Sequence, residues 1–382
     1  MLLHLLHDDK VCNRTIANFE EALPNKNIYI CIADRRNLQY ISADAKVVFI
    51  NNPSSFSNVS LLDNVKCVLI HYLDRQKIEF VNKYISDPNI KIIWSLWGGD
   101  IYNDILISYG YNPYYERSFV QRFSFKIKVV SILIRMLGGR TYLSKVKETT
   151  TFIEKRVDVL LSSEAEFELI KSYLKNTLNC HNASLTLYYP IEDTLGGLFK
   201  RRITGNNIVI GNSASFTNNH LYAFDFLGKL NTRGRDKIVP LSYGGSPEYI
   251  NHVEKCGDLK WGYEFRSVRN FMPLEEYNRM MLSASVFIYG NWRQEAIGNI
   301  VIALYLGAKV FISEKSPLLR HFSSKGIKVY VTERMTQDDI DSPISNADFE
   351  CNREAIMRLY SREVIISHIR SFFSAYIVLP CK

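Results

Sequence analysis

Residues 286–313, with the sequence VFIYGNWRQEAIGNIVIALYLGAKVFIS, constrain the fold more than any other stretch of the chain. A short apolar run rich in β-branched and aromatic residues is followed by a polar loop, then by an apolar run with helical spacing and a second short apolar run. This order predicts a strand, a loop, a helix and a second strand, which together are the smallest unit of a parallel sheet. The stretch therefore predicts an α/β protein.

The same alternation of strand and helix patterns runs through both halves of the chain. The expected strands are 2–6, 28–33, 47–50, 67–72, 91–96, 158–162 and 184–189 in the first half, and 208–210, 238–242, 266–271, 286–289 and 310–312 in the second. The expected helices are 13–23, 75–85, 164–174, 219–230, 247–256, 274–283 and 300–306. Residues 190–207 break the alternation and are the expected linker. The pattern predicts two doubly wound, Rossmann-like domains at residues 1–190 and 207–382, with C-terminal helices that can pack back on the first domain.

Length and composition agree with two folded domains, because 382 residues exceed the usual size of one hydrophobic core. The start, MLLHLLHDDK, has no basic segment ahead of its apolar residues, and no apolar run approaches the roughly 18 residues of a membrane span. The seven cysteines form no C-x-x-C pair, so we expect neither a disulfide framework nor a zinc site. These features predict a cytoplasmic protein that is not integral to a membrane.

The net charge of +8 is unevenly distributed along the chain. Residues 117–147, the basic segment, carry eight Lys or Arg side chains and no Asp or Glu, interleaved with apolar residues. Basic and apolar residues at helical spacing are typical of a helix that lies on anionic lipid headgroups, which predicts a peripheral protein at a membrane surface. The alternative is a helix that buries its apolar face in the domain core. Nucleic acid is a weaker third option, because no nucleic-acid motif accompanies the segment.

In doubly wound sheets, ligands bind beyond the carboxyl ends of the strands, and unusual residues collect there in the second half. The candidate ligand-binding residues are Gly211, Asn212, Ser213, Asn218 and His220 after strand 208–210; Tyr243, Gly244 and Gly245 after strand 238–242; and Arg293, Gln294, Glu295, Ile297, Gly298 and Asn299 after strand 286–289. Glycines that allow close approach, together with helix starts, suit a nucleotide diphosphate. The chain has neither G-x-G-x-x-G nor G-x-x-x-x-G-K-[ST], which argues against a dehydrogenase and a P-loop NTPase and leaves enzymes that use nucleotide-sugars. The alternative is an ordinary strand-to-helix turn in which Arg293 pairs with Glu295.

Several motifs, in their order along the chain, match one family. They are Leu3-His4 with Asp8 and Asn13-Arg14-Thr15, Trp94 with Trp97-Gly98-Gly99-Asp100-Ile101-Tyr102, Gly211-Asn212-Ser213 with Asn218 and His220, residues 240–244, Glu276-Tyr277, and Arg293-Gln294 with Ile297-Gly298. With these motifs the chain resembles the 4-acetamido-4,6-dideoxygalactosyltransferases that act on a polyprenyl-diphosphate oligosaccharide in the assembly of enterobacterial common antigen. This family is also called 4-alpha-L-fucosyltransferase.

The resemblance implies a glycosyltransferase of the GT-B type, with two Rossmann-like domains that face each other across a cleft. It implies transfer of a 6-deoxyhexose from a dTDP-linked donor to a lipid-linked glycan, as in the synthesis of O-antigen or common antigen at the cytoplasmic face of the inner membrane. It also implies that no metal or other cofactor takes part. The acceptor would then bind the first domain, where the matching residues are Asn13, Thr15, Trp97, Gly98, Gly99 and Tyr102.

Chemical roles follow for the candidate residues. Arg293 would bind the donor diphosphate in place of a metal ion, and Glu295 would accept hydrogen bonds from sugar or ribose hydroxyls. The general base would be Asp8, Asp9 or Asp100, with Asp100 ranked below the other two because it could instead cap a helix. Further candidates for the base are His4, His7 and His71.

Three other interpretations stay open. Asp339 and Asp341 match the metal-binding D-x-D motif of another glycosyltransferase architecture, and we interpret the match as chance because it lies far from any expected strand end. A nucleotide-sugar 2-epimerase would share the two-domain plan without an acceptor site. A non-catalytic glycan- or lipid-binding protein would keep a pocket but need no acid or base.

Overall fold

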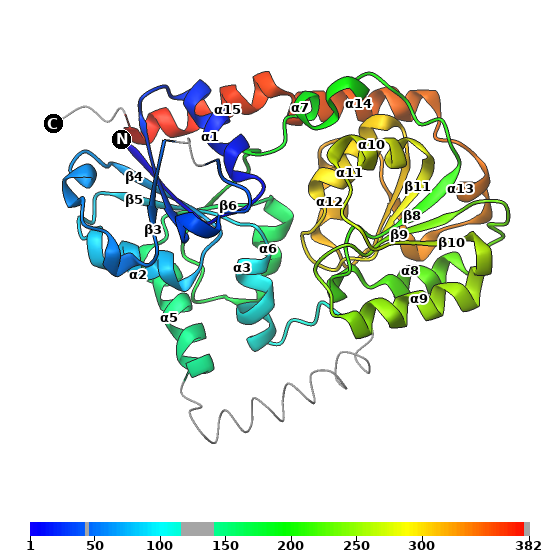
Figure 1. The fold of residues 1–382 in the computed structure, drawn as a ribbon, viewed down its shortest axis with the longest axis horizontal. Coiled ribbons are helices and arrows are strands. Elements are labelled where there is room, and N and C mark those ends of the chain that lie inside the picture. The colour runs from blue at the N-terminus through cyan, green and yellow to red at the C-terminus, as the bar shows by residue number, and fades with distance from the viewer. Residues whose placement is uncertain (43–45, 116–140, 378–382) are drawn as a thin grey trace. The chain divides into compact units, whose positions relative to one another are not determined.

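The computed structural model describes residues 1–42, 46–115 and 141–377. The chain divides into two compact units (Figure 1), and each is a parallel sheet covered by helices. Among the described residues, the first unit comprises 1–42, 46–111, 141–190 and 359–377, and the second comprises 112–115 and 191–358. Residues 112–115 therefore group with the second unit, and the C-terminal helix groups with the first.

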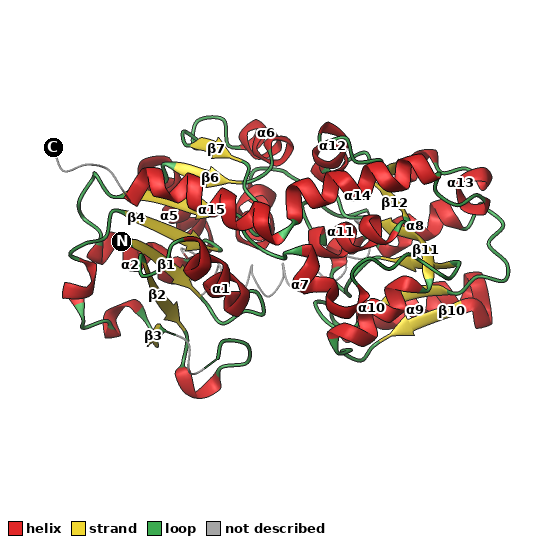
Figure 2. Cartoon of the chain, turned by 90° about the horizontal axis from the view of Figure 1, so that it is seen from above, coloured by secondary structure: helices red, strands yellow, loops and turns green. Residues whose placement is uncertain are grey.

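The sheet of the first unit has the strand order β3-β2-β1-β4-β5-β6-β7 among the described residues, and all of its strands run parallel (Figure 2). The strands are β1 (Leu2–Leu6), β2 (Asn27–Ile32), β3 (Val47–Ile50), β4 (Cys67–His71), β5 (Lys91–Ser95), β6 (Val159–Leu161) and β7 (His181–Ala183). The helices are α1 (Cys12–Ala22), α2 (Arg75–Tyr84), α3 (Gly99–Ile101), α5 (Thr141–Arg156), α6 (Glu164–Tyr173) and α15 (Arg362–Ile377).

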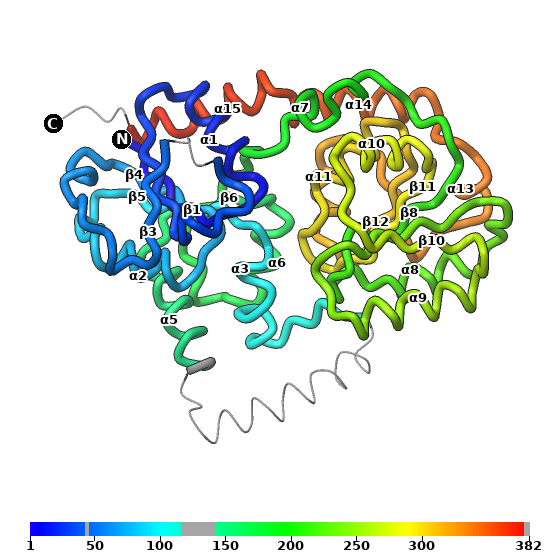
Figure 3. Tube along the Cα trace, in the orientation of Figure 1, coloured from blue at the N-terminus to red at the C-terminus, as the bar shows by residue number. Residues whose placement is uncertain are grey.

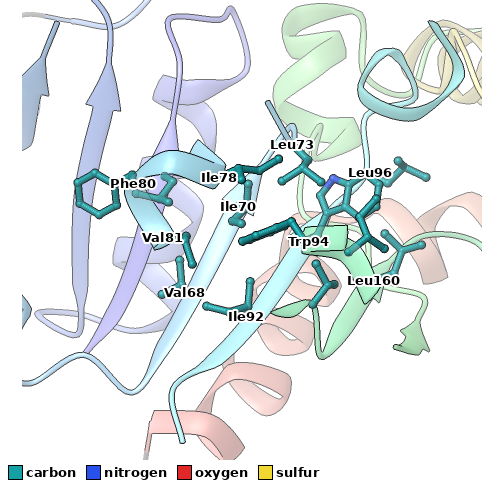
Figure 4. Close-up of a cluster of buried hydrophobic side chains, with 14 of the residues drawn as sticks. Val68, Ile70, Leu73, Ile78, Phe80, Val81, Ile92, Trp94, Leu96 and Leu160 are labelled. Carbon is teal, nitrogen blue, oxygen red and sulfur yellow. The ribbon is translucent and has the colours of Figure 1, made fainter. Parts of the chain in front are cut away.

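Both faces of this sheet are buried, which explains why its strands are almost continuously apolar. One face packs against α2, α5 and α6, and Figure 4 shows part of this core around Trp94 and Phe80. The other face packs against α1 and α15, where Phe19 meets Phe373 with ring centroids 5.3 Å apart. Helices from opposite ends of the sequence thus lie side by side on this face (Figure 3).

The sheet of the second unit has the strand order β10-β9-β8-β11-β12-β13, again parallel throughout the described residues. The strands are β8 (Asn207–Ile210), β9 (Lys237–Pro240), β10 (Phe265–Val268), β11 (Ala284–Tyr289), β12 (Lys309–Ile312) and β13 (Tyr330–Val331). The helices are α7 (Ile191–Leu195), α8 (His220–Leu227), α9 (Pro247–Trp261), α10 (Leu274–Leu282), α11 (Ile297–Leu306), α12 (Pro317–Ser324), α13 (Gln337–Asp341) and α14 (Asn346–Tyr360). Helix α11 is buried from Ile300 to Leu306, as expected of a helix that is apolar on every side.

The α/β architecture with two doubly wound sheets is confirmed, and most expected elements agree with the structure to within a few residues. The expected strand 184–189 is wrong, because the strand there is β7 and ends at Ala183. Tyr188 instead turns its hydroxyl into a buried hydrogen-bond network, and Tyr189 has a φ of +61°, which cannot continue a strand. The expected linker 190–207 contains the short helix α7.

The basic segment lies outside the described residues up to residue 140. Its described remainder begins α5, where Lys145 and Lys147 are exposed. Among the helices that the structure describes, none combines the length and the apolar character needed to cross a bilayer.

Helix α15 supplies a test of the first unit. Phe373 is fully buried between α1 and the sheet, whereas its neighbour Phe372 is only partly buried. Replacing Phe373 with Ala should lower the free energy of unfolding of the first unit by about 3–5 kcal/mol, because a buried ring leaves a cavity. Urea unfolding followed by circular dichroism measures this loss. The matched control Phe372→Ala should cost clearly less, and an equal loss would contradict the described packing of α15.

Candidate functional site

In the second unit, the candidate residues lie where the order of the strands across the sheet reverses. From β8 the chain runs to β9 and β10 on one side, and then crosses to β11 on the other (Figure 1). Such a switch point leaves a crevice beyond the carboxyl ends of its two central strands, here β8 and β11. Gly211 directly follows β8 with a φ of +73°, and a Cβ at this position would lie 2.8 Å from Asn218 Oδ1. Only glycine therefore fits this turn.

A carboxylate joins the loops that follow β8 and β11. Glu295 Oε2 accepts hydrogen bonds from Thr217 Oγ1 (2.6 Å), Asn291 Nδ2 (2.9 Å) and Arg293 Nε (3.0 Å). Its other oxygen accepts one from Asn218 Nδ2 at 3.4 Å. The Arg293 and Glu295 side chains are both largely shielded from solvent, with 11% and 15% exposed. The network, which we call the Glu295 network, therefore fixes both loops at the sheet edge, and it includes the ion pair anticipated as the alternative role for Arg293.

The start of α11 is available to an anion. The residue that precedes the helix, Ala296, has a φ of +65° and no side chain that could cap the free N–H groups of the first turn. A non-glycine residue in this conformation is strained, and such strain is often found at ligand sites. The first turn contains Ile297, Gly298 and Asn299, whose N–H groups and the helix dipole favour negative charge.

The loop after β9 packs against the loop after β8. Ala214 N donates to Tyr243 O (2.7 Å), and Asn212 Nδ2 lies 3.3 Å from the Tyr243 hydroxyl. A Cβ on Gly245 would lie 2.2 Å from Ala214 O, so this close approach also requires glycine. Tyr243 is 44% exposed, which leaves part of its ring available to a ligand.

These loops contain a buried histidine, which has a hydrogen-bond partner, and two buried amide oxygens, which have none among the described residues. His220 is fully buried with Nδ1 3.0 Å from the Tyr249 hydroxyl, and burial lowers its pKa to about 3, so that it supports the loop as a neutral ring. The amide oxygens of Asn212 and Gln294 are buried without a hydrogen-bond partner among the described residues. An unpaired buried amide oxygen is costly, and a bound ligand with a donor group would relieve that cost.

In the first unit, the candidate carboxylates have different surroundings. Asp8 accepts hydrogen bonds from the backbone N–H groups of Gln39, Tyr40 and Ile41, and so holds a loop. Asp9 Oδ1 accepts one from Val11 N (3.1 Å), while its Oδ2 has no hydrogen bond to a described residue. Both residues lie at the end of β1, beside β4, which is the switch point of this sheet.

Asp100 is buried and has every oxygen engaged. Its Oδ2 accepts from Trp94 Nε1 (2.7 Å) and Leu73 N (3.1 Å), and its Oδ1 accepts from Trp97 N (3.2 Å). Burial raises the pKa of Asp100 to about 6, although these hydrogen bonds act in the opposite direction. The contacts join the ends of β4 and β5, which favours a structural role for Asp100.

A buried chain of polar side chains leads from the core to Trp97. Asn27 Oδ1 can only accept, so His4 Nε2 donates to it (3.2 Å). Burial lowers the pKa of His4 to about 3 and holds that of His71 well below its usual value, so both rings are neutral. His71 Nε2 must then donate to His4 Nδ1 (3.1 Å), the Tyr188 hydroxyl to His71 Nδ1 (2.8 Å), and Trp97 Nε1 to the Tyr188 oxygen (2.9 Å). The chain, which we call the His4–Tyr188 chain, thus orients the Trp97 indole.

The remaining candidates of the first unit mainly hold local structure. Asn13 Nδ2 donates to Tyr40 O (2.7 Å), Thr15 Oγ1 donates to Val11 O (2.9 Å), and Tyr102 is buried. Gly98 has a φ of +91°, and a Cβ on Gly99 would lie 3.2 Å from the Tyr72 ring. Both glycines therefore serve the turn that brings Trp97 to the sheet edge.

Asp339 and Asp341 both make contacts within the α13 region. Asp339 accepts from Thr336 N (3.0 Å) and caps α13, and Asp341 accepts from Gln337 Nε2 (3.0 Å). Within residues 1–42, 46–115 and 141–377, no group of three or more His, Cys, Asp and Glu side chains could hold a metal ion.

Thr217, Asn291 and Tyr188 belong to these networks and were not anticipated from the sequence. The first two lie in loops that were identified, and their hydroxyl and amide groups were a signal that could have been used. Tyr188 had no such signal, because it lies in the wrongly expected strand.

The buried histidines predict how stability depends on pH. When the folded pKa of a histidine lies far below its unfolded value of about 6.5, the unfolded state binds a proton that the folded state does not. The free energy of unfolding therefore falls as the pH falls below about 6.5. Each buried histidine of this kind should lower the free energy of unfolding by about 2 kcal/mol between pH 7 and pH 5. Asp100 acts in the opposite direction, since its folded pKa is raised, and offsets part of this loss.

Urea unfolding of the first unit at pH 7 and pH 5 measures this dependence. Replacing His4 with Gln should make the difference between the two pH values smaller by about 2 kcal/mol, whatever the variant does to stability at pH 7. The control His181→Asn alters an exposed histidine and tests whether the effect is specific to the buried ring. An unchanged difference in His4→Gln would contradict a neutral, buried His4.

Comparison of the whole fold identifies its class. Sucrose-phosphate synthase from Thermosynechococcus elongatus superposes with a TM-score of 0.67 at 10% identity, over 98% of this chain and 100% of that chain. HepE from Anabaena, in complex with UDP, superposes with a TM-score of 0.61 at 9% identity, over 98% of this chain and 100% of that chain. The α,α-trehalose 6-phosphate synthase from Burkholderia multivorans gives a TM-score of 0.58 at 10% identity, over 99% and 98%. The two parallel-sheet units are therefore those of the GT-B fold.

The family is identified by sequence. The model of the family described as 4-alpha-L-fucosyltransferase, glycosyl transferase group 56, matches residues 155–357, which is more than half of the chain. The matched region includes the loops after β8, β9 and β11 and therefore the whole Glu295 network. The chain thus belongs to the 4-alpha-L-fucosyltransferase family of glycosyltransferases.

Proposed function

We propose that this glycosyltransferase moves a 6-deoxyhexose, either a 4-acetamido-4,6-dideoxyhexose or fucose, from a dTDP-linked donor to a polyprenyl-diphosphate-linked oligosaccharide in the synthesis of a bacterial surface polysaccharide. The observation that carries the proposal is the Glu295 network beside the uncapped start of α11. It combines a cation, a helix N-terminus and sugar-binding polar groups at one sheet edge. The resemblance of the motifs in these loops to the family suggests the deoxysugar and the lipid-linked acceptor.

The second unit would hold the donor. The diphosphate would lie against the Gly211 turn and the first turn of α11, where close backbone approach and free N–H groups favour an anion. Arg293 uses its Nε to bind Glu295, so that the guanidinium is already oriented when a phosphate arrives. HepE, which shares the fold, has been crystallised with UDP and with UDP-glucose, and this supports a nucleotide-sugar as the ligand.

The first unit would supply the proton acceptor. In the reaction, the acceptor hydroxyl oxygen attacks the anomeric carbon, the bond from that carbon to the donor phosphate breaks, and the nucleoside diphosphate leaves with the bonding electrons. The hydroxyl proton passes to a carboxylate, which must lie within hydrogen-bond reach. Of the three acidic candidates, Asp9 suits this role best, because its Oδ2 is not engaged by a described residue, whereas Asp8 and Asp100 hold backbone N–H groups.

A lipid-linked acceptor would require the enzyme to work at a membrane surface. The basic segment, with eight cations and no carboxylate, suits this purpose, since each Lys or Arg near an anionic surface contributes about 1 kcal/mol. The protein would then be peripheral at the cytoplasmic face of the inner membrane.

The test is transfer itself. The purified protein should transfer sugar from one member of a panel of dTDP- and GDP-linked deoxysugars to a short-chain polyprenyl-diphosphate oligosaccharide. Mass spectrometry detects the product.

Activity should survive EDTA, because helix N–H groups and Arg293 neutralise the diphosphate in place of a metal ion. Loss of activity in EDTA that manganese restores would contradict the metal-free site. A free epimerised sugar, formed without acceptor, would instead indicate an epimerase.

Arg293 provides the sharpest test of the donor site. Replacing it with Ala should weaken binding of dTDP about tenfold or more, since a charge-assisted contact to phosphate is lost. Isothermal calorimetry measures the affinity, and thermal unfolding shows whether the variant is folded. Arg279→Ala is the matched control, because Arg279 is exposed and forms a helix ion pair with Glu275. Equal affinity in Arg293→Ala and the wild type would refute the assignment.

A further inference from the structure

Lys77 in α2 is a buried cation at the carboxyl ends of β1 and β4. Its side chain is fully shielded from solvent. Its Nζ donates to Tyr72 O (2.9 Å) and to the Asp74 carboxylate, and it lies 3.3 Å from His7 Nδ1. An ammonium group has three N–H donors and no acceptor. Three acceptors therefore account for all of its protons, and the third acceptor is His7 Nδ1.

This contact fixes the tautomer of His7. Burial, assisted by the charge of Lys77, lowers the pKa of His7 to about 4, so that the ring is neutral at neutral pH. A neutral imidazole carries one proton, and Nδ1 uses its lone pair to accept from Lys77. The proton must therefore lie on Nε2. No described residue forms a hydrogen bond with Nε2, and this nitrogen is not among the buried unpaired atoms, so its N–H is open to a ligand.

The surroundings of His7 indicate what that ligand is. Its ring lies 5.1 Å from the ring of Trp97 and 5.2 Å from that of Tyr72, measured between centroids. Tyr72 has a φ of +63°, a strained conformation for an aromatic residue, and the His4–Tyr188 chain holds Trp97 in place. Flat aromatic faces beside hydrogen-bonding groups suit a sugar ring.

The charges that act on His7 distinguish a phosphate oxygen from a hydroxyl oxygen. The carboxylates of Asp8, Asp9 and Asp74 act on His7, whereas Lys77 is the cation that acts on it. This balance repels a phosphate oxygen and accepts a neutral hydroxyl. A sugar hydroxyl oxygen therefore suits this position better than a phosphate oxygen.

We propose that His7 donates its Nε2–H to a hydroxyl oxygen of the acceptor sugar, packed beside Trp97, and that Lys77 is the positioning residue that keeps His7 in this donor form. The proposal rests on the transferase function proposed above and adds the role of His7 to it. His7 is then a substrate-binding donor and not the general base, which distinguishes it from the carboxylate that takes the proton.

Two substitutions of His7 separate a donor from a base. Gln places an N–H close to the position of His Nε2 and cannot accept a proton at neutral pH, whereas Ala removes the group. We expect His7→Gln to keep kcat/KM within about threefold of the wild type, and His7→Ala to lose about tenfold to a hundredfold, as for a lost hydrogen bond. A general base would lose about a hundredfold to ten-thousandfold in both variants. Equal losses in both variants, or no loss in His7→Ala, would overturn the proposal.

A spectroscopic measurement tests the tautomer without any activity. In protein carrying ¹⁵N-labelled histidine, the His7 signals should show a protonated Nε2 and an unprotonated Nδ1, assigned by their absence from His7→Gln. The opposite tautomer would overturn the proposal even if the Ala variant fails to fold. Replacing Lys77 with Met should allow the proton to exchange between both nitrogens, and an unchanged spectrum would mean that Lys77 does not hold the ring.

Failure of the proposed function gives a different result. A wild-type protein that transfers no sugar would refute the transferase assignment while leaving the tautomer measurement intact. Calorimetry with dTDP serves as the control, because His7 belongs to the first unit and its substitutions should not change the affinity of the second unit for the nucleotide.

Discussion

Each sheet consists of parallel strands among the described residues, and this single constraint positions most of the candidate residues described above. Parallel strands are buried on both faces, so polar side chains within them are costly unless they are paired. The carboxyl ends of all strands lie at one edge, where the chain must turn and where helix N-termini begin. Polar residues that are excluded from the core therefore gather at the same edge as the uncapped helix N–H groups.

The polar side chains that do lie inside the strands follow this rule. His4 and His71 are fully buried in β1 and β4, and they are tolerated because each ring nitrogen has a partner and neither ring is charged. The directions of these hydrogen bonds follow from one fixed acceptor, Asn27 Oδ1. Since all donors and acceptors of the His4–Tyr188 chain are determined in turn, it is a rigid support for Trp97 and a poor candidate for proton transfer.

The strands were predictable from sequence because an apolar run between turn residues has few other solutions in an α/β chain. Two edge strands were missed, β7 and the two-residue strand β13. The sequence of β7 is His181-Asn182-Ala183, whereas the more strand-like residues after it serve the core through Leu187 and Tyr188. The loops of the candidate site in the second unit were also predictable, since glycines and polar residues directly follow apolar strands.

The roles of individual carboxylates were less predictable, because a catalytic carboxylate and a structural one have the same sequence. Asp8 is engaged by residues 39–41, and Asp100 by Leu73 and Trp94, and neither partnership follows from local patterns. The same reasoning applies to Lys77. A lysine in a helix is normally assigned to solvent, and its burial becomes evident only when the ends of β1 and β4 lie beside it.

The two sheet edges differ in charge, and this difference has a chemical consequence. The second unit offers helix N–H groups, small residues and Arg293, whose Nε donates to Glu295. The first unit offers the carboxylates of Asp8, Asp9 and Asp74, whose charges act on His7, together with the buried Lys77 and the ring of Trp97. A diphosphate is favoured by the first set of groups and repelled by the second, whereas a neutral sugar hydroxyl can bind among carboxylates and give up its proton to one of them. This difference in charge supports the proposal that the anionic donor binds the second unit and the hydroxyl nucleophile binds the first.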